Sequence, residues 1–217
     1  MSNLPSISLI HGWATEPSIW GPVRSELELR GTPVSVYEMP GYGSRRDESG
    51  ILSLSQSVDD AVRHLPANAL WVGWSLGAMI ALSAAAKEGS SIAGVMAVCA
   101  TAKFCGDQNK ADSLGELQTA IQNNPSKAVS RFQRSMPCAA NRRTIARPGE
   151  ISDCTATKET LLSGLDVLSR ADLSDEVNKI GAPVRLVSGD EDPIIPASAA
   201  IELSRLISGS QFTTLPC

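Results

Sequence analysis

Ser75 lies at the centre of Gly73-Trp74-Ser75-Leu76-Gly77, between an apolar run typical of a strand (69–74) and one typical of a helix (76–86). A serine in this context predicts a nucleophile elbow, a sharp strand-to-helix turn that exposes the hydroxyl. The flanking glycines allow the bend without a Cβ clash. The N-terminus of the following helix favours negative charge beside the serine. We therefore expect a nucleophile for acyl transfer; the alternative is a glycine-rich turn between two core elements.

Acyl transfer also needs a carboxylate that orients the catalytic base. An acidic loop follows the apolar run 183–188, and Asp190, Glu191 and Asp192 all lie in it. A loop at the carboxyl end of a strand is a suitable place for a carboxylate that orients the base. A solvated acidic turn is the alternative for each residue.

The tripeptide His11-Gly12-Trp13 follows the first predicted strand, 6–10. We expect the amides of Trp13 and Leu76 to form the oxyanion hole, where each donor typically contributes about 3–4 kcal/mol. His11 is expected to make structural hydrogen bonds, and His64 to lie on a helix surface. Neither is a good candidate for the base.

The expected position of the base is the loop after the predicted strand 211–215, but the sequence given ends at Cys217. We expect a truncated sequence whose histidine lies just after Cys217. The alternative is a natural chain without this histidine, which would be weakly active or inactive because loss of the base costs several powers of ten in rate.

Strand-like and helix-like runs alternate along most of the chain. This alternation predicts a mostly parallel sheet flanked by helices. In the helix 54–65, Ser57 and Asp60 have the spacing of a capping box, and Pro66 is expected to stop the helix. Strands are expected at 6–10, 34–38, 69–74, 92–97, 183–188 and 211–215, and helices at 54–65, 76–87 and 197–207.

Residues 103–165 break this alternation, with helical segments and no clear strand. We expect them to form a helical lid inserted between core parts 1–102 and 166–217, the second of which is incomplete. Asn124-Pro125 should open a lid helix. On that helix Lys127, Arg131 and Arg134 share one face, whereas Val129, Phe132 and Met136 share the other.

Composition excludes several classes of function. The 217 residues suffice for one α/β domain, and the net charge of −4 argues against nucleic acid as a partner. No apolar run is long enough for a membrane span, and no signal peptide is recognisable. Five cysteines without Cys-x-x-Cys spacing and only two histidines argue against a zinc site, and we expect the cysteines to be reduced thiols in a cytoplasmic protein. We also expect no cofactor and a monomer.

Taken in order, these motifs resemble the α/β-hydrolase superfamily and, more narrowly, the pimeloyl-[acyl-carrier protein] methyl ester esterases of biotin biosynthesis. The resemblance covers nearly the whole chain, and Trp74 before the serine is its most specific element. It implies that Asp192 is the acid of the triad. The matching residues are His11-Gly12-Trp13, Trp20, Met39-Pro40-Gly41-Tyr42-Gly43, Leu70 to Gly77, Arg131-Phe132, Gly164-Leu165, Leu168, Asp172-Leu173 and Gly189-x-x-Asp192-x-x-x-Pro196.

The resemblance implies a serine esterase whose substrate is carried on acyl carrier protein, a small acidic protein. Residues 117–149 contain no Asp or Glu, which suits docking of an acidic carrier. Trp13 and Phe132 are expected to flank the acyl chain. The alternatives are a general short-chain carboxylesterase or thioesterase and a non-catalytic ligand-binding protein; a solvated charged face is the alternative for the lid. The expected docking residues are Lys127, Arg131, Arg134, Arg142, Arg143 and Arg147.

Overall fold

The computed structural model describes residues 5–48, 53–87, 89–136 and 154–216. Its centre is a six-stranded sheet with the order β2-β1-β3-β4-β5-β6, in which every neighbouring pair is parallel. All six strands lie within two residues of their predicted bounds. The strands are β1 (Ile7–Ile10), β2 (Val34–Tyr37), β3 (Leu70–Trp74), β4 (Gly94–Val98), β5 (Val184–Gly189) and β6 (Gln211–Leu215).

Helices flank this sheet, as predicted. Helix α3 (Leu76–Ala86) is buried at every residue and packs on β3 and β4, because its many alanines allow a close approach. Helix α2 (Leu54–His64) lies against α3, and α8 (Ala197–Leu206) packs on β5 and β6. Helix α1 (Gly21–Leu29), which was not predicted, has no buried residue and lies near β2.

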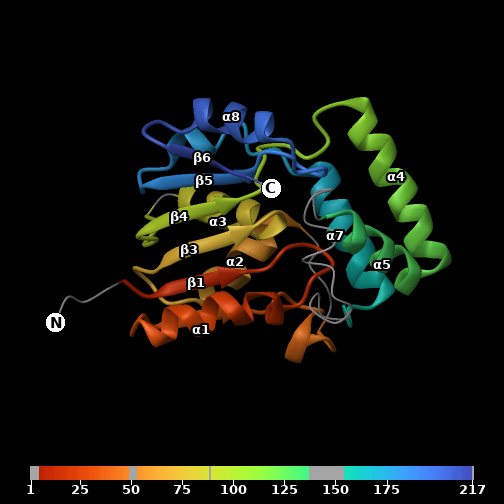
Figure 1. The fold of residues 1–217 in the computed structure, drawn as a ribbon, viewed down its shortest axis with the longest axis horizontal. Coiled ribbons are helices and arrows are strands. Elements are labelled where there is room, and N and C mark those ends of the chain that lie inside the picture. The colour runs from red at the N-terminus through yellow and green to blue at the C-terminus, as the bar shows by residue number, and fades with distance from the viewer. Residues whose placement is uncertain (1–4, 49–52, 88, 137–153, 217) are drawn as a thin grey trace.

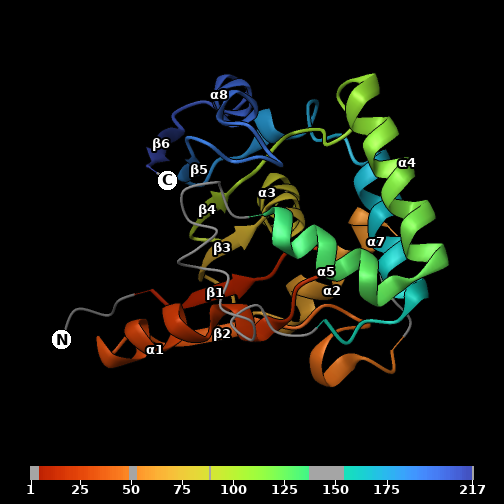
Figure 2. The ribbon, with the colours of Figure 1, turned by 45° about the vertical axis from the view of Figure 1, so that its right-hand side comes forward.

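Three of the helices described between β4 and β5 gather beyond the carboxyl ends of the strands, as Figures 1 and 2 show. They are α4 (Gln108–Asn123), α5 (Pro125–Ser135) and α7 (Lys158–Arg170). The chain enters and leaves this group side by side, since Lys103 forms an antiparallel bridge with Asp172. The expected end of the lid at residue 165 lies inside α7, which continues to Arg170. We call α4, α5 and α7 the lid helices.

Side-chain N-caps at the starts of α5 and α2 bear on the sequence predictions. Asn124 caps α5 by accepting a hydrogen bond from the Lys127 N–H (3.0 Å), as Asn124-Pro125 predicted. The predicted capping box in α2 is wrong. Ser53 is the N-cap, and its hydroxyl accepts from the Gln56 N–H (3.2 Å). Ser57 lies within the helix and donates to the Ser53 carbonyl instead.

Short 3₁₀ helices complete the connections: Pro17–Trp20, Gly43–Arg45 and Val177–Lys179. Among the described helices, none combines the length and the apolar character that crossing a membrane requires.

Candidate active site

Ser75 stands at the turn between β3 and α3 with φ 54° and ψ −116°, a conformation that is unfavourable for a residue with a Cβ. Its N–H donates to the Val98 carbonyl (2.9 Å), which fixes the turn to β4. The flanking glycines are sterically required. A β-carbon on Gly73 would lie 2.3 Å from the Gly77 carbonyl oxygen, and one on Gly77 would lie 2.4 Å from that of Ile10. These contacts are those of a nucleophile elbow.

The loop after β1 lies directly beside this elbow. A β-carbon on Gly12 would be 3.4 Å from the Ser75 Cβ, so the loop that carries the Trp13 amide runs beside the serine. Leu76 is the first residue of α3, where helix N–H groups have no intrahelical partner. Both expected oxyanion donors therefore lie in segments adjoining Ser75.

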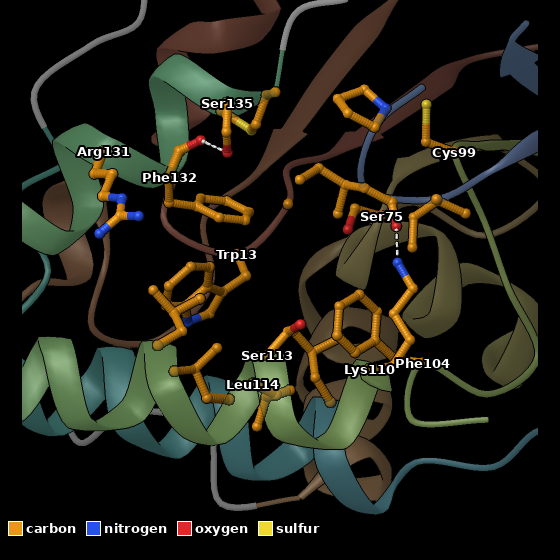
Figure 3. A pocket seen from close by; sticks show the side chains of 18 of the residues that line it. Trp13, Ser75, Cys99, Phe104, Lys110, Ser113, Leu114, Arg131, Phe132 and Ser135 are labelled. Atoms are coloured by element: carbon orange, nitrogen blue, oxygen red, sulfur yellow. Dashed lines mark hydrogen bonds between the residues drawn. The ribbon is translucent and has the colours of Figure 1, made fainter. Parts of the chain in front are cut away.

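A cavity of about 520 Å³ opens over Ser75 between the sheet edge and the lid helices (Figure 3). Trp13 and Phe132 meet edge to face at its wall, with ring centroids 4.9 Å apart. Its walls are mainly apolar, and the charged residues among them are Lys110, Glu116, Arg131 and Asp192. Such a cavity suits an acyl chain whose ester is presented to Ser75.

Of the three candidate acids, the structure places Asp192 on the wall of this cavity with Ser75, whereas Asp190 and Glu191 are exposed. The Asp192 Oδ1 accepts hydrogen bonds from the amides of Ile194 (2.8 Å) and Ile195 (2.9 Å). These two bonds hold the carboxylate in a fixed orientation at the carboxyl end of β5.

Cys99 also lies on the cavity wall, directly after β4. Burial raises the pKa of its thiol to about 12, and the neighbouring Asp192 carboxylate adds to this rise. The thiol is therefore protonated at neutral pH. Its position beside Asp192 was not anticipated from the sequence.

His11 is fully buried behind the elbow, as expected for a structural role. Its Nε2 accepts the Met39 N–H (3.3 Å), so the proton lies on Nδ1, which donates to the Gly12 carbonyl (2.9 Å). Burial lowers its pKa to about 4, so the ring is neutral at physiological pH. His64 lies at the end of α2, and its side chain is 50% exposed. Neither histidine lines the cavity.

Lid residues reach both sides of the site. The Trp13 indole N–H donates to the Leu161 carbonyl of α7 (2.9 Å), and Gly164 leaves room for the ring. The Lys110 ammonium of α4 donates to the Ile194 carbonyl in the acidic loop, as the dashed line at Lys110 in Figure 3 marks. Gln133 of α5 donates to the Ala14 carbonyl (2.9 Å). No local pattern predicts Lys110 or Gln133 as a contact, although Gln133 is a polar residue four positions after the buried Val129.

The profile of the alpha/beta hydrolase family matches residues 9–216. The chain belongs to the alpha/beta hydrolase family. The expectation drawn from the elbow and the alternating elements is therefore confirmed for the fold and for the family. In the part of this hydrolase that the structure describes, no three His, Cys, Asp or Glu side chains gather where they could hold a metal ion.

Eight curated relatives of this hydrolase carry the name pimeloyl-[acyl-carrier protein] methyl ester esterase, and two of them serve as examples. The protein from Methylococcus capsulatus is 30% identical over 220 residues, which cover 94% of this chain and 83% of the relative. That from Vibrio cholerae is 27% identical over 214 residues, covering 94% and 82%. The resemblance to this narrower family is thus confirmed as well.

Solved structures share the fold at lower identity. Bromoperoxidase from Bacillus anthracis has a TM-score of 0.88 at 17% identity, with 98% of this chain and 83% of that chain covered. The enol-lactonase from Burkholderia xenovorans LB400 has a TM-score of 0.83 at 21% identity, with 99% and 84% covered. At these identities the likeness concerns the fold alone.

The basic face of the hydrolase lid is present on α5. Lys127, Arg131 and Arg134 are all exposed, whereas Val129 is buried and Phe132 and Met136 line the cavity. Arg131 lines the cavity too, so the two faces meet at its position. The other three expected docking residues, Arg142, Arg143 and Arg147, lie outside the described residues.

Proposed function

We propose that the protein is a serine carboxylesterase that hydrolyses the methyl ester of pimeloyl-acyl carrier protein in biotin biosynthesis. The observation that supports it most directly is Ser75, held at φ 54° at an elbow that opens into the cavity. The names of the relatives support the same substrate. An esterase of this kind needs neither a metal nor another cofactor.

In the proposed reaction the Ser75 hydroxyl attacks the ester carbonyl and passes its proton to a histidine base oriented by Asp192. The amides of Trp13 and Leu76 stabilise the oxyanion. The protonated histidine then gives its proton to the departing methoxide, and methanol leaves. Water, deprotonated by the same base, hydrolyses the acyl-enzyme.

We place the base after β6. The Asp190 N–H donates to the Leu215 carbonyl (3.0 Å), so the end of β6 lies beside the acidic loop. Because β6 is parallel to β5, residues that follow it leave the sheet at the same edge as Ser75 and Asp192. A histidine just after Cys217 would be close to both.

The lid is proposed to separate the two parts of the substrate. The acyl chain would lie in the cavity between Trp13 and Phe132. The acidic carrier would dock outside, on the basic face of α5 and on Arg142, Arg143 and Arg147. Opposite charge at such a surface mainly accelerates association, and salt should weaken it.

Charge reversal on the lid tests the carrier partner. Because Arg131 also lines the cavity, the sharper variant reverses Lys127 and Arg134 to Glu and leaves Arg131 in place. The matched control reverses Lys179 and Arg205, which are exposed on other elements and change the net charge equally. We expect kcat/KM for the carrier-linked ester to fall at least tenfold in the lid variant alone, with a small ester unaffected.

Equal rates of the lid variant and the control on the carrier-linked ester would contradict carrier docking and favour a general short-chain esterase or thioesterase. A full-length protein that hydrolyses neither ester, and whose Ser75 resists acylation, would instead indicate a non-catalytic ligand-binding protein.

A further inference from the structure

The turn of residues 12–15 presents one of the two proposed oxyanion donors. The Trp13 N–H belongs to the Gly12–Trp13 peptide, whose carbonyl points the opposite way because the peptide is trans. That carbonyl accepts hydrogen bonds from the Thr15 hydroxyl (2.9 Å) and from His11 Nδ1 (2.9 Å). Both donors fix the plane of the peptide and hence the direction of the N–H.

One residue of this turn has an unfavourable backbone conformation. Ala14 is fully buried and has φ 54°, the left-handed region that residues with a Cβ avoid. Such a conformation persists only where the surroundings hold it. The position holds alanine rather than glycine, so contacts to Ala14 itself are needed in addition to the local bonds to the Gly12 carbonyl.

Gln133 supplies such a contact from the lid. Its side-chain Nε2 donates to the Ala14 carbonyl (2.9 Å), and the residue is 9% exposed, so little water competes for the bond. On the other side of Ala14, the N–H lies 3.4 Å from the buried Tyr42 hydroxyl, which is a weaker contact. The only short side-chain bond to Ala14 among the described residues therefore comes from α5.

We propose that Gln133 is a positioning residue for the oxyanion hole: by holding the Ala14 carbonyl, it fixes the turn that aims the Trp13 N–H at the site. The role rests on the proposed esterase function. This role makes the lid helix α5 a structural part of the catalytic centre. The same helix carries both the basic outer face and Gln133.

The test compares two substitutions in the full-length protein. Gln133→Met keeps the length of the side chain and removes the donor, while Gln122→Met makes the same change on the exposed surface of α4. Hydrogen exchange of the backbone amides of residues 12–16, followed by mass spectrometry, needs no catalysis. We expect exchange at least tenfold faster in Gln133→Met and unchanged in Gln122→Met.

Kinetics then test the link to the oxyanion. In Gln133→Met, kcat should fall about ten- to a hundredfold for small and carrier-linked esters alike, with KM within about twofold, because the lost stabilisation belongs to the transition state. A trifluoromethyl ketone, which adds to the serine as an oxyanion, should bind correspondingly more weakly. The matching alcohol, which fills the cavity without an oxyanion, should bind as before.

Unchanged exchange in Gln133→Met would overturn the proposal, as would equal weakening of ketone and alcohol, since the latter indicates a change of cavity shape. If Gln133→Met fails to fold, Gln133→Asn keeps the amide but shortens its reach, and an intermediate effect is expected. A wild-type protein without esterase activity whose residues 12–16 still exchange faster in Gln133→Met would refute the function while leaving the restraint intact.

Discussion

Gly77, the second residue of α3, lies directly against the last residue of β1: a β-carbon there would be 2.4 Å from the Ile10 carbonyl oxygen. The helix that begins at the nucleophile therefore touches the strand that leads to the oxyanion turn. This contact sets the distance between the two segments whose amides we assign to the oxyanion hole.

Gly77→Ala should consequently damage both stability and activity. The methyl group meets backbone atoms, which cannot move aside, so we expect a loss of about 1–3 kcal/mol in the free energy of unfolding. Gly115→Ala is the control. It lies in α4 with nothing within 4 Å of the new methyl, and it should stabilise the protein by about 0.5–1 kcal/mol. Chemical denaturation measures both; a Gly77→Ala protein as stable as wild type would contradict the close contact.

The backbone strain at Ser75 predicts a difference in stability between two inactive variants. Ser75→Ala and Ser75→Gly should each lose several powers of ten in kcat because the nucleophile is removed. Glycine adopts φ 54° without a steric penalty, so Ser75→Gly should be about 1 kcal/mol more stable than Ser75→Ala. Equal or reversed stabilities in thermal unfolding would argue against a strained elbow.

His11 should make the protein sensitive to mild acid. Burial lowers its folded pKa to about 4, whereas the unfolded value is 6.5, so the unfolded state binds more protons between these pH values. Stability contributed by the neutral ring is therefore complete above pH ~6.5 and declines as pH falls towards 4, by about 3 kcal/mol in all. Denaturation of wild type and His11→Asn across this range isolates the effect.

The assignment of the triad acid predicts a clear difference within the acidic loop. Asp192→Asn should lower kcat by about 10³–10⁴-fold, because the base loses the carboxylate that orients it. Glu191→Gln, the exposed neighbour, should retain the wild-type rate. If both variants, or neither, lose activity, Asp192 is not the orienting group.

A readout that does not depend on catalysis comes from Cys99. The Asp192 carboxylate contributes to the raised thiol pKa, so Asp192→Asn should lower that pKa, while burial, the larger cause, remains. The pH profile of Cys99 alkylation, followed on the Cys99 peptide by mass spectrometry, should therefore shift to lower pH. An unshifted profile would place the carboxylate away from Cys99.

The parts that sequence predicts well are those set by local pattern. The six strands follow from apolar runs, and the elbow from glycines that the turn requires. The capping of α2 was misplaced because two serines four residues apart, Ser53 and Ser57, both precede good helix formers. Asp60, expected to take part in that cap, instead accepts hydrogen bonds from the Tyr37 hydroxyl and the Arg45 guanidinium.

Contacts between distant segments were beyond sequence reasoning. Gln133 and Ala14 are separated by 119 residues, and Lys110 and Ile194 by 84, so nothing in the local pattern brings either pair together. Helix α1, which was not predicted, buries no residue, so no wide apolar face marks it in the sequence.

The reactivity of Ser75 tests the central claim most directly. The full-length protein is incubated with a fluorophosphonate probe, and the modified residue is located by peptide mass spectrometry, with Ser75→Ala as the control. We predict one phosphonyl adduct, on Ser75, which is absent from the Ser75→Ala protein. A wild-type protein that remains unlabelled, or is labelled elsewhere and equally in Ser75→Ala, would contradict the assignment of a serine esterase.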